Sequence, residues 1–192
     1  DTGRRREEQM QQIEAHHLAA ISLVTVHETY PGHHLQLGHA MKVGSRLRRL
    51  AKSVVLTEGW AHYCEELMGE MGFYTADPLG RLWQLRDALW RACRVVVDVG
   101  LHTESMTFMQ AVDYLADTAM VPRVNAVTEV RRYTLTPTEP MSYLVGKREL
   151  VAIREETKAR LGSRFDLYDF NGALLGSGSI PPALLRQEMA ER

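Results

Sequence analysis

The residues between His27 and His34 carry the strongest chemical signal in the chain. The segment reads His-Glu-Thr-Tyr-Pro-Gly-His-His, so a His-Glu pair and two further histidines fall within eight residues. Glu58 follows 25 residues after His33. Neutral imidazoles and a carboxylate make a common set of catalytic zinc ligands, with one position left for water. A glutamate beside the first ligand, here Glu28, is where a general base for that water belongs. The pattern predicts a zinc hydrolase, and among zinc hydrolases we favour a peptidase.

The spacing of the histidines departs from the His-Glu-x-x-His pattern, in which two histidines one helical turn apart bind one zinc. Position i+4 from His27 is Pro31, which cannot bind a metal. In an unbroken helix His33 would point about 120° away from His27, and His34 would lie about 10 Å further along the axis. Because proline disfavours helix at the residue before it, we expect a two-residue bulge over Tyr30–Gly32. The bulge would make His33 the second ligand and turn His34 toward the substrate.

Glu58 is expected to bring the third ligand from a later helix. His62 lies four residues further on and shares the same helix face, and we assign it to substrate binding. Glu65 and Glu66 follow and are read as surface charges. The alternative is that these histidines and carboxylates are interior or solvated residues without a metal, because eight histidines in 192 residues make some clustering unsurprising.

Two segments of the chain resemble those of a bacterial family catalogued as domain of unknown function 885 (DUF885), whose members are regarded as zincin-like metallopeptidases. They are His27–Gln36 and Thr57–Tyr63. Later segments that match the family in the same order cover residues 96–102, 129–133, 142–146 and 174–181. The chain is also similar to helical zinc peptidases of the thimet oligopeptidase and Taq carboxypeptidase types, in which a Gly-His pair ends the motif and a later helix supplies a glutamate.

The resemblance implies a zincin-like helical metallopeptidase catalytic domain with zinc bound by His27, His33 and Glu58. Because members of the family are usually much longer, we expect this chain to be the C-terminal catalytic part of a longer protein. The N-terminal remainder of that protein would be a partner of this domain and would supply one wall of the cleft.

Four further residues are candidates for a role in the site. Tyr143 would donate a hydrogen bond to the oxyanion formed during hydrolysis, or it is a core tyrosine. Arg132 would clamp a substrate carboxylate, or it forms an ion pair with Glu129. His102 would contact the substrate or cap a helix end, and His34 would bind the substrate.

Bulk composition describes an ordinary soluble globular chain. Hydrophobic residues make up 45% and charged residues 24% of the chain, and the net charge is −1, so nothing indicates a nucleic-acid or membrane partner. The cluster of Arg46, Arg48 and Arg49 is short and balanced by acids. No apolar run approaches the ~20 residues of a membrane span. Two cysteines leave the redox compartment open, and we favour the cytoplasm.

The hydrophobic pattern is helical almost throughout, without a convincing strand or repeat. We therefore predict an all-α fold in one domain over residues 1–192. Asp77 and Pro78 read as the start of a helix that ends before Gly100. The other expected helices cover residues 7–26, 33–44, 47–71, 106–117, 124–133 and 139–161, with a helix from Asp166 or Asp169 and a last one after Ile180.

Together these residues favour zinc-dependent hydrolysis of peptide bonds, with short peptides as substrates. Two alternatives remain open. The chain could be a non-catalytic helical binding or scaffold domain without metal, or a zinc amidohydrolase that acts on a non-peptide amide. Metal analysis separates the scaffold from the two enzymes.

Overall fold

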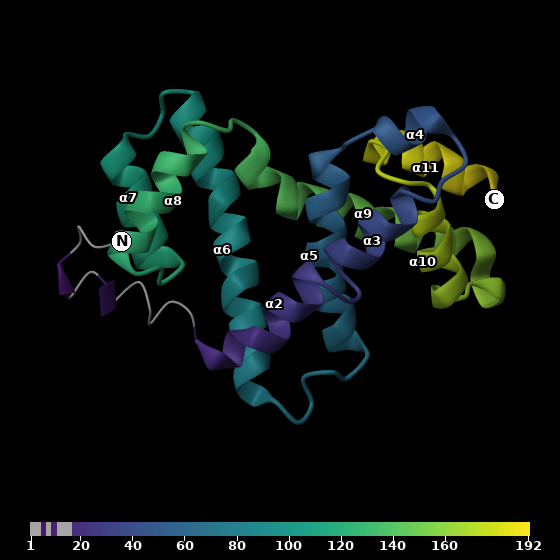
Figure 1. Ribbon diagram of the computed structural model, residues 1–192, viewed down its shortest axis with the longest axis horizontal. Helices are drawn as coiled ribbons and strands as arrows, with labels where there is room; N and C mark the ends of the chain where they lie inside the picture. Colours follow the sequence, from purple (N-terminus) through teal and green to yellow (C-terminus); the bar gives the residue numbers. More distant parts are fainter. Residues whose placement is uncertain (1–4, 7–8, 11–16) are drawn as a thin grey trace. The chain divides into compact units, whose positions relative to one another are not determined.

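The computed structural model of the chain describes residues 5–6, 9–10 and 17–192. Within this part of the chain every regular element is a helix, which confirms the predicted all-α fold (Figure 1). The elements are η1 (Leu18–Ala20), α2 (Ile21–Glu28), α3 (His33–Ala40), α4 (Arg46–Leu50), α5 (Val54–Glu70), α6 (Pro78–His102), α7 (Phe108–Thr118), α8 (Arg123–Tyr133), α9 (Glu139–Leu161), η2 (Gly162–Arg164), α10 (Leu167–Gly176) and α11 (Pro182–Glu191).

The chain divides into two compact units, each made from two separate stretches of sequence. Unit 1 comprises residues 1–23 and 72–141, and unit 2 comprises residues 24–71 and 142–192. Two helices, α2 and α9, begin in unit 1 and continue into unit 2. This division does not test the prediction that residues 1–192 form a single domain, which stays a prediction.

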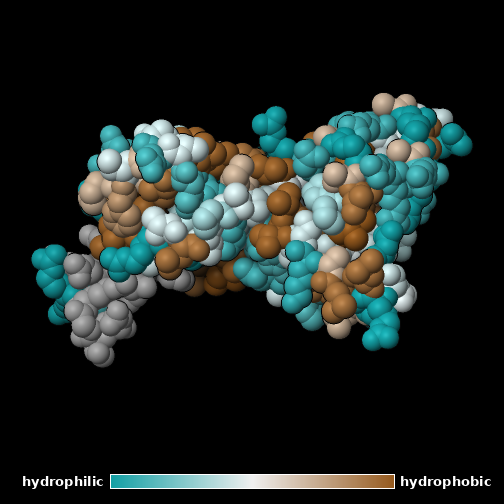
Figure 2. All heavy atoms as spheres, turned by 90° about the horizontal axis from the view of Figure 1, so that it is seen from above, coloured by the Kyte–Doolittle hydropathy of each residue, from teal (hydrophilic) through white to brown (hydrophobic). Residues whose placement is uncertain are grey.

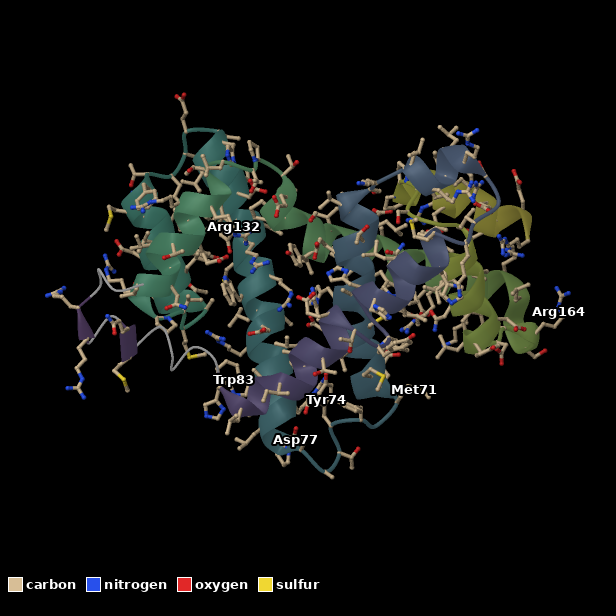
Figure 3. The ribbon with its side chains drawn as sticks, viewed as in Figure 1. Met71, Tyr74, Asp77, Trp83, Arg132 and Arg164 are labelled. Carbon is tan, nitrogen blue, oxygen red and sulfur yellow. The ribbon has the colours of Figure 1, made fainter. Side chains whose placement is uncertain are left out.

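Unit 1 is built around α6, the longest described helix, with α7 and α8 packed beside it (Figure 1). Asp77 begins α6 as predicted, because its carboxylate accepts a hydrogen bond from the Gly80 backbone and Pro78 occupies the first turn (Figure 3). Side chains from all three helices form the core, among them Val97, Leu115 and Val130.

Unit 2 is organised by a close approach of α5 and α9. A Cβ atom on Gly146 of α9 would lie only 1.8 Å from the carbonyl oxygen of Val55 and 2.7 Å from the Cα of Gly59, both on α5. The two glycines therefore let the helix backbones touch. Leu56 and Trp60 of α5 and Leu150 of α9 form the core with residues of α10 and α11.

Three helix boundaries differ from the prediction. The helix expected over residues 47–71 is two helices, because the Ser53 hydroxyl accepts from the Leu56 backbone and starts α5 anew. Gly100 does not end α6, which continues to His102; instead, a Cβ there would lie 2.8 Å from the Met106 Cβ, so the glycine makes room for packing. The helix expected over residues 33–44 ends at Ala40.

The helix expected over residues 7–26 lies in part outside the described residues. Its described part comprises residues 9–10, which are helical, and residues 17–26, which lie in η1 and α2 apart from His17. Among the described helices, none combines the length and the apolar content that a membrane crossing needs. Apolar and polar side chains are interspersed on the face drawn in Figure 2, and several apolar side chains of α6 are exposed, among them Leu82, Leu85 and Leu89.

Candidate metal centre

The histidine segment is divided between two helices. Helix α2 ends at Glu28 and α3 begins at His33, and the four residues between them, which include a cis Tyr30–Pro31 peptide, form no helix. The predicted interruption at Pro31–Gly32 and the start of a second helix at His33 are confirmed, but the break covers four residues and is not the two-residue bulge expected over Tyr30–Gly32. Pro31 cannot donate a helical hydrogen bond, and Gly32 packs so tightly that a Cβ on it would lie 1.8 Å from the His27 carbonyl oxygen.

Helix α5 holds this break in place. The Trp60 indole nitrogen donates to the Pro31 carbonyl oxygen at 2.9 Å, and the Cys64 thiol contacts the same oxygen at 3.5 Å. Because Trp60 and Cys64 are one turn apart, both reach Pro31 from one face of the helix that also carries Glu58.

The break brings His27, His33 and Glu58 together. One ligand atom from each lies within 4.8 Å of the other two. Glu58 Oε2 is 3.3 Å from His33 Nε2 and 3.7 Å from His27 Nε2. Ligand atoms about 2.1 Å from a tetrahedral zinc are about 3.4 Å from one another. The two distances are therefore those expected of ligands that share one zinc ion.

The three side chains are largely shielded from solvent, with 8% of His27, 14% of His33 and 21% of Glu58 exposed. Burial alone would raise the pKa of Glu58. The imidazoles of His27 and His33 outweigh that effect and lower the pKa to about 2. Glu58 is therefore an ionised carboxylate at neutral pH, as a metal ligand must be.

One atom of the group supports a metal more directly. Glu58 Oε2 is buried and makes no hydrogen bond with a described residue. The nearby imidazoles stabilise the ionised oxygen without forming a regular hydrogen bond to it, and a bound cation would give it a direct partner. Two imidazole nitrogens and a carboxylate oxygen are zinc ligands, and they leave one tetrahedral position for water. The residues present thus fit a zinc ion.

The interpretation of Glu65 as a surface charge is wrong. Its side chain is fully buried, and its two oxygens lie 2.7 Å from His27 Nδ1 and 3.2 Å from His62 Nδ1. His62 is fully buried as well, which argues against the predicted contact between His62 and a substrate. A signal for Glu65 was present in the sequence, since it lies two turns after Glu58 on the same helix face.

Of the two predicted catalytic residues, Tyr143 lies beside the group, and Glu28 follows His27 in the chain. The Tyr143 ring, from α9, is nearly parallel to the His27 ring at a centroid distance of 6.1 Å. Glu28 is exposed at the end of α2, directly after His27 in the chain. Tyr143 and Glu28 both belong to unit 2, as do all three candidate ligands.

Of the two adjacent histidines, the structure places His33 in the group and His34 at the surface. His34 is exposed and lies against the Tyr30 ring, at a centroid distance of 5.5 Å. The structure thus groups His33, and not His34, with His27 and Glu58, and it leaves the side chain of His34 exposed.

The remaining predicted substrate contacts, His102 and Arg132, belong to unit 1. His102 Nδ1 lies 2.9 Å from Asp98 Oδ1, and the Asp98 carboxylate also accepts from the backbone at the start of α9. Arg132 projects from α8 (Figure 3) and pairs with Glu129 at 3.0 Å and Glu139 at 3.2 Å. To bind a substrate carboxylate, the guanidinium of Arg132 would have to release Glu129 or Glu139.

Comparison with known proteins agrees with the resemblance seen in the sequence. The profile of DUF885, described as a bacterial protein of unknown function, matches residues 7–189. The structure of a candidate lipoprotein from Colwellia psychrerythraea matches with a TM-score of 0.87 and 36% identity, over 91% of this chain and 30% of that one. The structure of a candidate lipoprotein of unknown function from Shewanella oneidensis matches with a TM-score of 0.88 and 31% identity, over 98% of this chain and 34% of that one.

The chain thus spans about a third of the length of each of these two proteins. A comparison with curated proteins gives no match. With nearly its whole length matched by the family profile, the chain belongs to DUF885, a family of bacterial proteins of unknown function.

Proposed function

We propose that this chain carries the zinc centre of a zincin-like metallopeptidase that hydrolyses short peptides. The observation that supports the proposal most is the group of His27, His33 and Glu58. Glu58 Oε2 lies 3.3 Å from His33 Nε2 and 3.7 Å from His27 Nε2. Charged and imidazole side chains that converge in a shielded place are typical of functional sites.

Each residue has a stated role in the proposal. His27, His33 and Glu58 would hold the zinc ion, which when bound acts as a Lewis acid and lowers the pKa of water to about 7. Glu28 takes the proton from the attacking water and passes it to the leaving amine. The Tyr143 hydroxyl donates a hydrogen bond to the oxyanion that develops on the peptide carbonyl.

The proposal extends to the substrate and to the longer protein. His34, His102 and Arg132 would contact the peptide. The chain would be the C-terminal part of a longer protein, and the remainder of that protein would form one wall of the substrate-binding cleft. The two solved relatives, each with about two thirds of its length outside the match, are consistent with a longer protein. The cytoplasmic location stays a prediction.

The proposal is tested first by metal analysis of the chain purified without chelator or added metal. We expect zinc in equimolar amount. The chain is then incubated with a peptide library and the products are identified by mass spectrometry, with and without a chelator. Cleavage that stops with the chelator and returns with added zinc is the expected result.

The other outcomes select the alternatives. A folded chain that contains no metal and does not take up zinc contradicts the proposal and favours a scaffold domain. A chain that binds zinc, cleaves no peptide, and hydrolyses a simple amide would replace the peptidase by an amidohydrolase.

A further inference from the structure

The carboxylate of Glu65 stands out among the groups outside the three candidate ligands. Glu65 is fully buried, yet both of its oxygens meet an imidazole nitrogen, one on His27 at 2.7 Å and one on His62 at 3.2 Å. A buried carboxylate costs much free energy unless it is paired and hydrogen-bonded. This carboxylate contacts Nδ1 of a candidate metal ligand, and we therefore expect it to have a function at the metal centre.

The spacing of two glutamates on α5 explains how one helix reaches both sides of the His27 ring. Residues seven apart in a helix point within about 20° of each other and are about 10 Å apart along the axis. Glu58 lies on the Nε2 side of His27, at 3.7 Å, and Glu65 lies on its Nδ1 side, at 2.7 Å. The imidazole of His27 is thus held between two carboxylates of a single helix.

The contact with Glu65 also selects the position of the proton on His27. A carboxylate can only accept hydrogen bonds, so the nitrogen that faces it must carry the hydrogen. In its neutral form, His27 is then the tautomer with hydrogen on Nδ1 and a lone pair on Nε2. That lone pair is on the side where Glu58 Oε2 and His33 Nε2 meet.

We propose that Glu65 and His62 form a buried positioning pair that fixes the orientation and tautomer of His27 for metal binding. Glu65 acts on His27 directly, and His62 holds the second oxygen of Glu65 so that the carboxylate cannot rotate. His33 lacks such a support among the described residues, because its Nδ1 is buried without a hydrogen-bond partner. His27 is therefore the ligand that the fold orients in advance.

This inference rests on the proposed metal centre, but its first test needs no metal. In the metal-free chain, proton–nitrogen NMR recorded over a series of pH values shows when the ring of His27 is neutral and which of its nitrogens then carries the hydrogen. The His27 signal is identified by its loss in His27→Gln. We expect the Nδ1–H tautomer in the wild type, and a shift toward Nε2–H in Glu65→Gln, whose amide NH₂ group can face His27 and needs an acceptor there.

The second test measures metal affinity with Co²⁺, by competition with a coloured chelator and from the visible absorption of the bound ion. Glu65→Gln should bind Co²⁺ about 10–100-fold more weakly, as expected when the partner of a metal-binding histidine is removed. Its absorption spectrum should also change, since the ring of His27 is no longer held.

Glu66→Gln is the matched control, because Glu66 is the next residue on α5 but is partly exposed and pairs with Lys147. It should behave as the wild type in both tests. Thermal unfolding of the metal-free proteins detects a purely structural effect. If Glu65→Gln is only less stable, and its folded form keeps the His27 tautomer and the Co²⁺ affinity, the inference is overturned.

Two further outcomes are informative. If Glu65→Gln does not fold, Glu65→Asp replaces it, since its shorter carboxylate cannot reach both imidazoles, and an unchanged tautomer there overturns the inference. A wild type with the Nδ1–H tautomer of His27 that binds no metal would support the role of Glu65 in orienting His27 and contradict the proposed peptidase.

Discussion

At the scale of single residues, Glu28 is the candidate whose role depends least on packing. It is exposed, directly follows His27, and is not one of the three grouped candidate ligands. We expect Glu28→Gln to keep its zinc and to lower kcat by about 10²–10⁴-fold, because the amide cannot take a proton from water. Metal content and peptide turnover are measured on the same sample. Loss of zinc together with activity would make Glu28 a ligand and contradict its role as base.

Tyr143 is expected to act on the transition state alone. Its ring lies beside His27 on a different helix, so the phenylalanine variant keeps the ring and loses only the hydroxyl. We predict that Tyr143→Phe lowers kcat by about 10²-fold, with little change in KM or zinc content. Tyr168→Phe, on an exposed tyrosine of α10, is the control. An unchanged kcat in Tyr143→Phe would contradict this role and favour the alternative that Tyr143 is a core tyrosine.

The pH dependence of metal binding should come from the histidines and not from Glu58. The pKa of Glu58 is lowered to about 2, so its carboxylate stays charged until far below neutral pH. A histidine, in contrast, must lose its proton to bind a metal, so metal affinity should be lower at about pH 5 than at about pH 7. Glu58→Gln should weaken Co²⁺ binding by a similar factor at both pH values. A factor that vanishes at about pH 5 would mean that Glu58 is already protonated there.

Residue types and spacing predicted that His27, His33 and Glu58 lie together, but they did not predict the contact of His27 with Glu65. His27 and His33 could be chosen because the segment matches the residue types of a zinc motif, and Glu58 because the resemblance implies a glutamate ligand on a later helix. The charge of Glu65 predicts a surface position, whereas its burial depends on His27, which comes from another helix. Charge alone indicates exposure, and only the tertiary contact reverses that expectation.

At the scale of helices, the contact between α5 and α9 should affect both the stability of the fold and metal binding at the site. A methyl group on Gly146 would meet backbone atoms of α5, which cannot move aside as a side chain could. We expect Gly146→Ala to lower the free energy of unfolding by about 1–3 kcal/mol and to weaken metal binding, because α5 carries Glu58 and Glu65. Urea unfolding measures the first effect and Co²⁺ titration measures the second.

Gly172→Ala provides the control for this prediction. A Cβ on Gly172 of α10 would meet nothing within 4 Å. This variant should gain up to about 1 kcal/mol, because alanine is the better helix former. If Gly146→Ala is as stable as Gly172→Ala, the helices are not held at the distance described.

Helix starts were more predictable than helix ends. Asp77 and Pro78 form a local signal that needs no tertiary contact, and α6 begins there. Ser53 is also a local signal, but residues 51–53 contain neither glycine nor proline, and the prediction ran one helix through them. Gly100 was read as a stop, whereas its role depends on Met106, which follows the end of α6 and could not be placed from sequence.

At the scale of the whole molecule, the chemistry is concentrated in one of the two units. Unit 2 contains the three candidate ligands, Glu65 and the two predicted catalytic residues, although its two stretches are separated by 70 residues of unit 1. Unit 1 contains His102 and Arg132. No pattern in the sequence marked this division, because the boundaries fall near the ends of continuous helices or within them.

The central claim is that His27, His33 and Glu58 bind one zinc ion, and the adjacent pair His33 and His34 tests it most directly. Isothermal titration of zinc is carried out on the wild type, His33→Ala and His34→Ala, with folding checked by circular dichroism. The account predicts equimolar binding to the wild type and to His34→Ala, and loss of that binding in His33→Ala. Equal zinc binding by folded His33→Ala and wild type, or loss of binding in His34→Ala alone, would contradict it.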